Sequence, residues 1–331
     1  MNIRERIEKN EELLLSPYAV KSSLSKGRAR KEEKCELRTD FQRDRDRIIH
    51  SKAFRRLKHK TQVFLSGEDD HYRTRLTHTL EVAQISRTVA RALALNEDLT
   101  EAIALGHDLG HTPFGHAGER ALNEVSPTGF YHYKHSVRTA QKLEKDGQGL
   151  NLTHEVIDAI LCHTNATAET LEGRIIEIAD KIAYINHDIE DAINGGIITS
   201  DDLPKSAVET LGKTTSDRIS ALIYALVTDK TRSIRLLGEI KESFDLLHSF
   251  MFDAVYKNPV AKSEEGKAQD IIKYLYNHFM SNPEKLPKLY KNVMEKEGLN
   301  RAVCDYIAGM SDNFAIKFYE ELVIPKAWSV I

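Results

Sequence analysis

Apolar residues recur with helical spacing along nearly the whole chain, and this periodicity limits the fold more than any other feature. One helical face carries His78, Val82, Ile85, Val89 and Leu93, at steps of three or four residues. The alternating pattern typical of half-buried β-strands is nearly absent. The sequence therefore predicts an all-α fold, with His78 on a buried face.

Three further helices are predicted from the same spacing. One follows the N-cap candidate Thr100 and carries His107 on its inward side. Another follows Thr153 and brings His163 onto its apolar face. The longest covers residues 171–193 and ends before two glycines, which commonly terminate helices.

The longest predicted helix has an apolar and a polar face. Its apolar stripe is Ile178, Ile182, Ile185, Ile189 and Ile193. Its polar stripe is Asp180, Tyr184, His187, Asp188 and Asp191. The polar stripe suits either a site or a solvated surface, and the spacing alone does not distinguish them.

Composition narrows the class of protein. The 331 residues are 41% hydrophobic and carry a formal net charge of −3, which excludes a disordered chain or a polycation. Three scattered cysteines favour a reducing compartment over a disulfide framework. No apolar run approaches the roughly 18–20 residues of a membrane span. We expect a cytoplasmic protein without a membrane partner.

The N-terminal segment differs from the rest in charge. Residues 1–60 hold 18 Lys and Arg against 10 Asp and Glu. This excess of positive charge is compatible with phosphate recognition or with nucleic acid as a regulator or partner.

Histidine is concentrated in one part of the chain. Nine of the 14 histidines lie between His71 and His163, where an even distribution predicts about four. Among them, His78 and His107 stand on inward faces, and inward ionisable groups need partners. Together with Asp108 and Asp180 they form a candidate site for one divalent cation, assembled from three helices. Taken singly, an inward histidine is more often a hydrogen-bonded core residue than a metal ligand, and Asp180 alone would suit a solvated face.

A glycine-rich stretch follows the His107-Asp108 pair. Beyond it, His116 and Glu119 are three residues apart at the start of a predicted helix and share one face. Such a couple can orient a water molecule or protonate a leaving oxygen. A helix cap with an acidic first turn would use the same residues.

Five blocks of sequence resemble the deoxynucleoside triphosphate triphosphohydrolases of the dGTPase family, which contain an HD domain. They are residues 41–64, 73–93, 104–124, 178–192 and 304–315. The resemblance implies an HD-domain helical bundle with a helical C-terminal extension. It also implies hydrolysis of dGTP or several dNTPs to deoxynucleoside and inorganic triphosphate, through attack of water on the α-phosphorus.

The family pattern assigns roles residue by residue. The implied ligands of one divalent ion, Mn²⁺, Mg²⁺ or another first-row cation, are His78, His107, Asp108 and Asp180. The implied catalytic couple is His116 and Glu119. The implied substrate contacts are Gln62 and Asp188 on the sugar 3′-hydroxyl, Tyr184 against the deoxyribose, and Arg75, His111, His132 and Lys181 near the phosphates.

Other residues have weaker assignments. Tyr133 and His135 stand where many bacterial members carry Asn and Gln. Arg55 and Arg56 are candidates for phosphate or effector contacts, or for solvated surface charge. The remaining histidines of the dense region, His71, His154 and His163, are expected to be structural or to support the residues that bind metal and substrate.

The chain is expected to form one globular unit in three parts. These are a basic helical segment (1–60), an HD-domain core with the metal site (61–200) and a helical C-terminal region packed on that core (201–331). The resemblance further implies a homo-oligomer, a dimer or hexamer, with a possible dNTP effector. Two other functions stay open: an HD phosphohydrolase acting on another nucleotide, and a nucleotide-sensing or nucleic-acid-binding protein.

Overall fold

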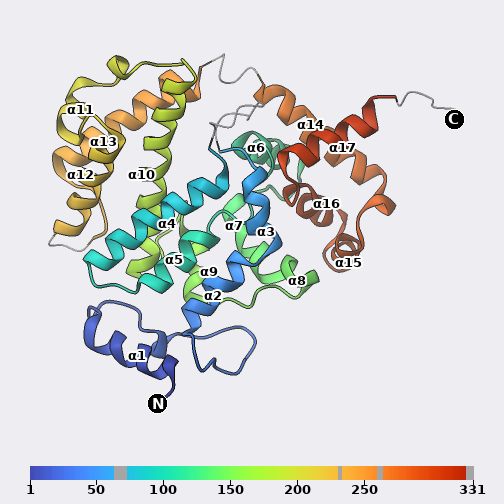
Figure 1. Ribbon diagram of the computed structural model, residues 1–331. Helices are drawn as coiled ribbons and strands as arrows, with labels where there is room; N and C mark the ends of the chain where they lie inside the picture. Colours follow the sequence, from blue (N-terminus) through green and yellow to red (C-terminus); the bar gives the residue numbers. More distant parts are fainter. Residues whose placement is uncertain (63–72, 230–232, 259–263, 326–331) are drawn as a thin grey trace, which may run out of the picture.

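The computed structural model describes residues 1–62, 73–229, 233–258 and 264–325 (Figure 1). Within these ranges the chain forms helices joined by turns, and its only β-type pairings are two isolated bridges. The predicted all-α fold is confirmed. None of the described helices combines the length and the apolar character needed to cross a lipid bilayer.

The described residues up to position 194 supply ten α-helices. They are α1 (Ile3–Leu14), α2 (Asp40–Ile49), α3 (Lys52–Arg56), α4 (Arg75–Ala92), α5 (Glu97–Gly106), α6 (Gly115–Val125), α7 (His132–Arg138), α8 (Glu144–Gly147), α9 (His154–Cys162) and α10 (Leu171–Asn194).

The second half continues as helices. They are α11 (Lys205–Leu211), α12 (Thr215–Thr228), α13 (Gly238–Met251), α14 (Glu265–Ser281), α15 (Lys288–Glu297), α16 (Leu299–Ala308) and α17 (Asp312–Val323).

The centre of the molecule is built around α4, α5 and α10. Helix α5 packs against α2, α4, α9 and α10, and α4 also packs against α10 and α12 (Figure 1). Ile85, Ile103 and Ile176 from these three helices are almost fully buried in one hydrophobic core. Because their apolar faces converge, the polar groups on adjacent faces are brought together inside the protein.

A second core lies beneath α6 and the C-terminal helices. Leu122 of α6 is buried with Phe279 of α14 and Ile307 of α16. Helices α14–α17 stand on the opposite side of the molecule from α11–α13 (Figure 1). Helix α6 therefore connects the central bundle to the C-terminal helices.

Helix α10 is buried on both of its faces. Ile182, Ile185 and Ile189 lie in the core as predicted. On the polar face, His187 and Asp188 are 3% and 1% exposed, and Asp180 and Tyr184 are half-buried. The polar stripe therefore does not form a solvated surface.

One predicted helix start is wrong and another differs in its hydrogen bonding. Helix α5 begins at Glu97, because Asn96 accepts a hydrogen bond from Leu99 N at 3.1 Å. The Thr100 hydroxyl donates to the Asn96 carbonyl at 2.8 Å, inside the first turn. At α9, Thr153 is the N-cap, but its hydroxyl donates to Asp44 at 2.7 Å and makes no capping bond.

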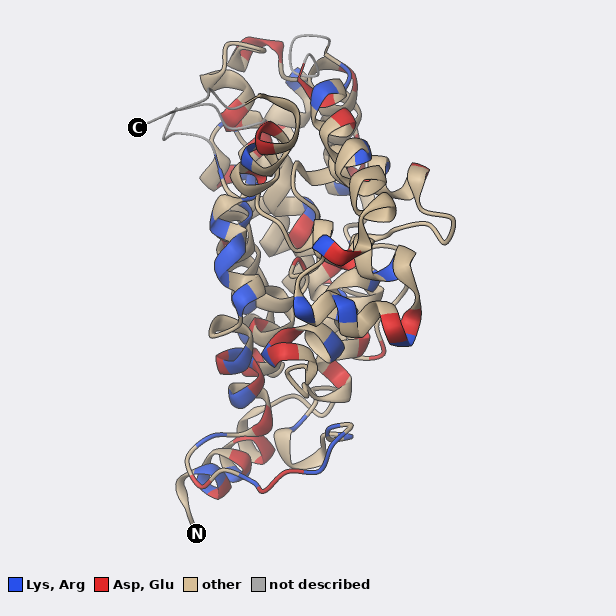
Figure 2. Ribbon diagram, turned by 90° about the vertical axis from the view of Figure 1, so that its right-hand side faces the viewer, with Lys and Arg blue, Asp and Glu red and all other residues tan. Residues whose placement is uncertain are grey.

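Much of the positive charge in the N-terminal segment is used in internal ion pairs. Arg28 pairs with buried Asp44, while Arg43 and Arg47 pair with Glu32. Blue and red residues are interspersed around this end of the molecule (Figure 2). Because these basic side chains are paired within the protein, fewer of them are available to bind a polyanion such as nucleic acid than the composition alone suggests.

The contribution of the buried ion pair between Arg28 and Asp44 to the stability of the N-terminal segment can be tested by mutation. Asp44 also accepts from Thr153 N at 2.8 Å. Replacing Asp44 with Ala removes the shorter of two ion pairs of the buried guanidinium, whose other partner is Asp40 at 3.4 Å. We therefore expect a loss of about 3 kcal/mol in the free energy of unfolding, the lower end of the cost of breaking a buried pair. Chemical denaturation measures this change in the free energy of unfolding. The control Asp46→Ala, in the same helix but half-exposed, should cost about 0–1 kcal/mol; equal losses would contradict the assignment.

Candidate active site

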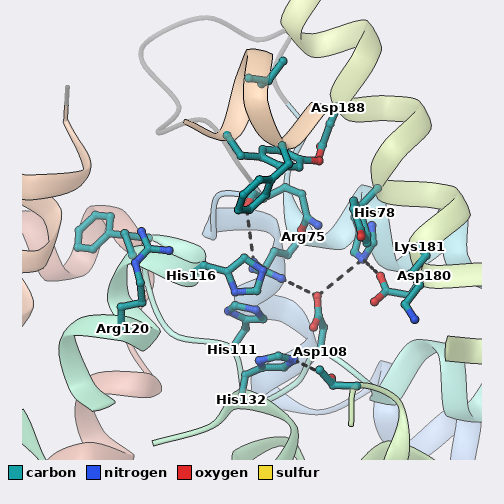
Figure 3. Close-up of a pocket in the computed structure, with 18 of the residues that line it drawn as sticks. Arg75, His78, Asp108, His111, His116, Arg120, His132, Asp180, Lys181 and Asp188 are labelled. Carbon is teal, nitrogen blue, oxygen red and sulfur yellow. Dashed lines mark hydrogen bonds and ion pairs between the residues drawn. The ribbon is translucent and has the colours of Figure 1, made fainter. Parts of the chain in front are cut away.

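A cavity of about 410 Å³ opens between the central bundle and α6. Its wall includes every predicted site residue except His107 and Glu119, which lie directly behind it. Figure 3 shows Asp108 at the centre, with His78 and Asp180 on one side and His111 and His132 on the other. The cavity is large enough for a small organic ligand.

The four predicted metal ligands come together on one wall. His78 lies in the first turn of α4, His107 and Asp108 follow α5, and Asp180 lies in the middle of α10. His78 Nε2 is 3.0 Å from Asp180 Oδ1 and 3.9 Å from Asp108 Oδ2. His107 Nε2 is 3.7 Å from Asp108 Oδ1 and 4.0 Å from Asp180 Oδ1. Donor atoms on one small cation, each about 2.0–2.2 Å from it, have separations of this size.

The ring of His107 is oriented to offer a lone pair. Its Nδ1 lies 2.6 Å from the carbonyl of Ala104, so this nitrogen carries the proton and donates. Nε2 is then the acceptor, and among the described residues this buried atom has no hydrogen-bond partner. An acceptor left alone in the interior is costly unless a cation or a donor reaches it. The donor set therefore fits a divalent ion.

His78 is supported by a chain of side chains that the sequence analysis did not identify. Its Nδ1 is 3.4 Å from Nε2 of His187, and His187 Nδ1 is 2.7 Å from Glu81. Arg73 donates to Glu81 at 2.9 Å. This relay fixes the ring of His78 so that Nε2 faces the carboxylates.

Both carboxylates of this group are held in their charged form. Burial alone would raise the pKa of Asp108, but His107 and Arg75 hold it well below its usual range. Burial is likewise outweighed at Asp180, where the hydrogen bond to His78 lowers the pKa. Arg75 itself donates to Asp108 at 2.7 Å. Two charged carboxylates and two imidazoles favour a cation at their centre.

The opposite wall carries the His116–Glu119 pair. His116 Nδ1 is 3.3 Å from Glu119 Oε2, and the His116 side chain is 64% exposed. Glu119 also accepts from the main-chain N–H of His132 at 2.8 Å and lies 2.9 Å from its Nδ1. Burial would raise the pKa of Glu119, but these two histidines lower it strongly. Glu119 is therefore a charged carboxylate shared by both.

The residues predicted to contact the sugar line the same cavity. Asp188 accepts from the Tyr256 hydroxyl at 2.5 Å, and burial raises the pKa of Asp188 to about 7. Tyr184 stands one turn before Asp188 on α10. Gln62 Oε1 is buried without a hydrogen-bond partner among the described residues. The unpaired amide oxygen of Gln62 and the carboxyl of Asp188 can each form a hydrogen bond with a ligand hydroxyl.

Comparison with known proteins identifies the family. The HD domain matches residues 75–185 and the phosphohydrolase-associated domain matches residues 234–321. A deoxyguanosinetriphosphate triphosphohydrolase-like protein of Caldanaerobacter subterraneus subsp. tengcongensis is 55% identical, covering 99% of this chain and 98% of that protein. One from Clostridium tetani is 47% identical, covering 98% and 97%. The chain belongs to this family of HD-domain hydrolases.

A solved structure supports the fold. A hypothetical protein from Aquifex aeolicus matches with a TM-score of 0.52 at 21% identity, covering 86% of this chain and 68% of the other. At this identity the match concerns the helical architecture alone.

The HD domain contains most of the site. All four candidate ligands, His116 and Glu119 lie within its 75–185 match. Asp188 lies just beyond its end, and Gln62 precedes it. Tyr256 comes from the phosphohydrolase-associated region, on the π-helical turn Phe252–Tyr256 that continues α13. Both matched domains therefore contribute to one cavity.

Several predicted contacts lie elsewhere. Arg55 is exposed and Arg56 lies 4.0 Å from Glu144, and neither lines the cavity. His135 is bonded to Gly110 O at 3.0 Å and lies outside the cavity, as does Tyr133. Of the histidines without a predicted ligand, His154 lies at the surface near Glu169, and His71 is outside the described residues.

Sequence reasoning missed several groups at the site. His163 was expected to be structural or supporting, yet it lines the cavity itself beside Thr164. Tyr256 and Arg120 also line it without having been predicted. For His187 a signal existed, because it falls on the polar stripe with Asp180. Nothing in the spacing connects Tyr256 to that helix.

Bound metal should stabilise the HD domain. At a Mn²⁺ concentration about 100 times the Kd, one ion that binds only the folded state adds about 2.7 kcal/mol. We expect added Mn²⁺ to raise Tm in a thermal-unfolding assay, and chelation to reverse it. Asp180→Asn should remove most of the shift, whereas exposed Asp201→Asn should keep it. An unchanged shift in Asp180→Asn would exclude Asp180 as a ligand.

Proposed function

We propose that this protein hydrolyses deoxynucleoside triphosphates to deoxynucleoside and inorganic triphosphate, using one divalent cation. The observation that carries this proposal is the pairing, across one cavity, of the His/Asp group with the His116–Glu119 couple. The names of the relatives, which refer to deoxyguanosine triphosphate, support the same substrate class.

The candidate ligands would hold the cation beside the α-phosphate of the substrate. There a divalent ion can polarise a phosphoryl oxygen and lower the pKa of a water molecule. Arg75 and Lys181 line this wall and supply positive charge for the phosphates. Lys181 is free to turn toward an anion, because its partner Glu177, at 3.0 Å, lies at the surface.

His116 would act on the departing oxygen. Attack of water on the α-phosphorus forms one P–O bond and breaks the bond to the 5′-oxygen, which then requires a proton. Glu119 is charged and engages His116 Nδ1, so Nε2 is directed away from Glu119 and can donate that proton. The proton released by the attacking water leaves to solvent or to a phosphate oxygen.

The sugar would be recognised at the other end of the cavity. Asp188 and Gln62 offer acceptors to the 3′-hydroxyl, and the Tyr256 hydroxyl orients the carboxyl of Asp188. The half-buried ring of Tyr184 would pack on the deoxyribose and leave little room for a 2′-hydroxyl. This arrangement favours deoxynucleotides over ribonucleotides.

The remaining alternatives and partners stay predictions. An HD phosphohydrolase acting on another nucleotide would use the ligand group without needing Asp188 or Gln62. Nucleic acid as a regulator is expected from the positive charge of residues 1–60. A dNTP effector and a dimeric or hexameric state are expected from the family resemblance alone. The ion pairs of the N-terminal segment weaken the case for a protein whose main role is nucleic-acid binding.

A product-resolved assay tests the reaction. Purified protein with Mn²⁺ or Mg²⁺ and each of the four dNTPs should release deoxynucleoside and triphosphate. Release of monophosphate and pyrophosphate would contradict cleavage of the bond between the α-phosphorus and the 5′-oxygen. Inert dNTPs alongside turnover of another nucleotide would support the alternative phosphohydrolase.

His116→Ala tests the proton donor. Loss of general acid catalysis should lower kcat by about 10²- to 10⁴-fold, with dNTP and metal binding retained. The matched control is His154→Ala, an exposed histidine that pairs with Glu169 away from the cavity. Unchanged turnover in His116→Ala would refute its role.

A further inference from the structure

We propose a second binding site, separate from the central cavity, for one hydrogen phosphate ion. A small cavity of about 50 Å³ lies between α3, α7, α8, α15 and α16. It has room for a few water molecules or for one tetrahedral anion. None of its lining residues lines the central cavity. The site therefore goes beyond the proposed function, which uses the central cavity alone.

Two cationic side chains of the small cavity have no close acidic partner. The Arg56 guanidinium is 4.0 Å from Glu144, at the outer limit of an ion pair. Its Nε is buried and has no hydrogen-bond partner among the described residues. The Lys145 ammonium, also in the wall, makes no ion pair with any described residue. Cationic donors that lack acceptors favour an anion between them.

The Tyr290 hydroxyl supplies a third donor. Burial raises the pKa of Tyr290 to about 12, so the hydroxyl keeps its proton. It lies beside Gly309 in the cavity wall and makes no hydrogen bond with any described residue. Guanidinium, ammonium and hydroxyl groups are the side-chain donors that commonly bind phosphate oxygens.

Two acidic residues of the wall are already bound by other donors. Glu144 accepts from the main-chain N–H groups of Lys52 and Ala53, at 3.0 and 2.8 Å, at the start of α3. Asp146 is 3.0 Å from the Lys52 ammonium. Because these contacts offset both negative charges, the repulsion that an anion would meet in the cavity is reduced.

The third acidic residue, Asp305, favours an anion that carries a proton. Asp305 is fully buried and accepts from the Arg138 guanidinium at 2.6 Å. Beside it, His135 directs Nδ1 at Gly110 O, at 3.0 Å, so this nitrogen carries the ring proton. Nε2 of His135 is buried without a hydrogen-bond partner, 3.4 Å from Asp305 Oδ1. Two buried acceptors this close need a donor.

Hydrogen phosphate supplies both kinds of contact. Its P–OH group can donate to the acceptors of His135 and Asp305, while its other oxygens accept from Arg56, Lys145 and Tyr290. Sulfate has the same shape but no proton at neutral pH, so it would leave the two acceptors unpaired. The geometry therefore distinguishes two anions of equal size.

The size of the cavity favours the free ion over a phosphate ester. Pockets for drug-sized ligands commonly measure about 300–1,000 Å³. A nucleoside attached to the phosphate would not fit within about 50 Å³. Inorganic phosphate is therefore the source of the phosphate group.

The site lies behind the turn that carries Asp108. Leu109 lines the small cavity, while its neighbour Asp108 lines the central one. Ala308 also lines the small cavity, and Lys60 joins its carbonyl to that of His111. Bound phosphate would connect α3 to α16 and hold this turn between them.

Equilibrium dialysis of the whole protein against radioactive inorganic phosphate, without metal or nucleotide, tests the site. We expect saturable binding, with sulfate competing at least about 10-fold more weakly than unlabelled phosphate. Arg56→Gln should weaken phosphate binding about 10- to 100-fold, and Tyr290→Phe about 2- to 10-fold. The matched control Arg55→Gln, exposed on the same helix, should bind as the wild type does. Lys181→Gln, which alters the central cavity, should also retain binding.

The opposite results would overturn the site. Absence of saturable binding, or unchanged binding in Arg56→Gln, would show that the small cavity holds only water. Binding lost in Lys181→Gln would place the phosphate in the central cavity. Equal competition by sulfate would exclude recognition of a proton, and equal competition by deoxyguanosine monophosphate would assign the site to an ester.

Two further features make the test decisive. Circular dichroism establishes that Arg56→Gln is folded; if it is not, Tyr290→Phe and the sulfate competition decide. Because no dNTP is present, the result does not depend on whether the protein hydrolyses one, and failure of this site would leave the proposed function intact.

Discussion

The buried carboxylate of Asp108 is the group on which the rest of the site depends. It is 3% exposed and charged, so the interior must supply compensating groups. Arg75 donates to it from the start of α4, and His107 and His78 face it from the ends of α5 and α4. Helices α4 and α5 must therefore converge on one point, where their apolar faces pack against each other.

Residues of the C-terminal helices hydrogen-bond to the segments next to the Asp108 site. Lys60 is buried and donates both to the carbonyl of His111 and to that of Ala308 in α16. At the start of α17, Asp312 accepts from Thr61 N at 2.8 Å and from Phe114 N at 3.0 Å. The turn that carries His111 and leads into α6 is thus fixed by the phosphohydrolase-associated region. That region shapes the cavity even where it does not line it.

Close backbone packing adds a second constraint on the same turn. A Cβ on Gly110 would lie 2.1 Å from the main-chain nitrogen of Ser136, so only glycine permits α7 to approach. Gly110 N also donates to Ser136 Oγ at 2.9 Å. Helix α7 carries His132, and the approach of the two segments therefore sets the distance between His132 and Asp108.

The sequence was sufficient to predict features that depend on local spacing. Helical periodicity placed His78 correctly on an inward face, and the three-residue step between His116 and Glu119 predicted their contact. For Asp180, periodicity gave only its position on the polar stripe of α10. The start of α5 was placed four residues late, because Asn96 and Thr100 are both good caps and only tertiary contacts choose between them. Tyr256 could not be predicted, since its contact with α10 depends on how α13 folds back.

The histidine excess becomes interpretable once the partner of each ring is known. His135 has one nitrogen 3.0 Å from Gly110 O and the other 3.4 Å from the Asp305 carboxylate, and it lies outside the central cavity. His107 and His163 each commit Nδ1 to a main-chain carbonyl, and His107 turns Nε2 toward Asp108. Composition and spacing cannot separate these two kinds of histidine, because the difference lies in which carbonyl or carboxylate reaches Nδ1. That partner fixes the tautomer, and the tautomer decides whether a buried imidazole can bind a cation.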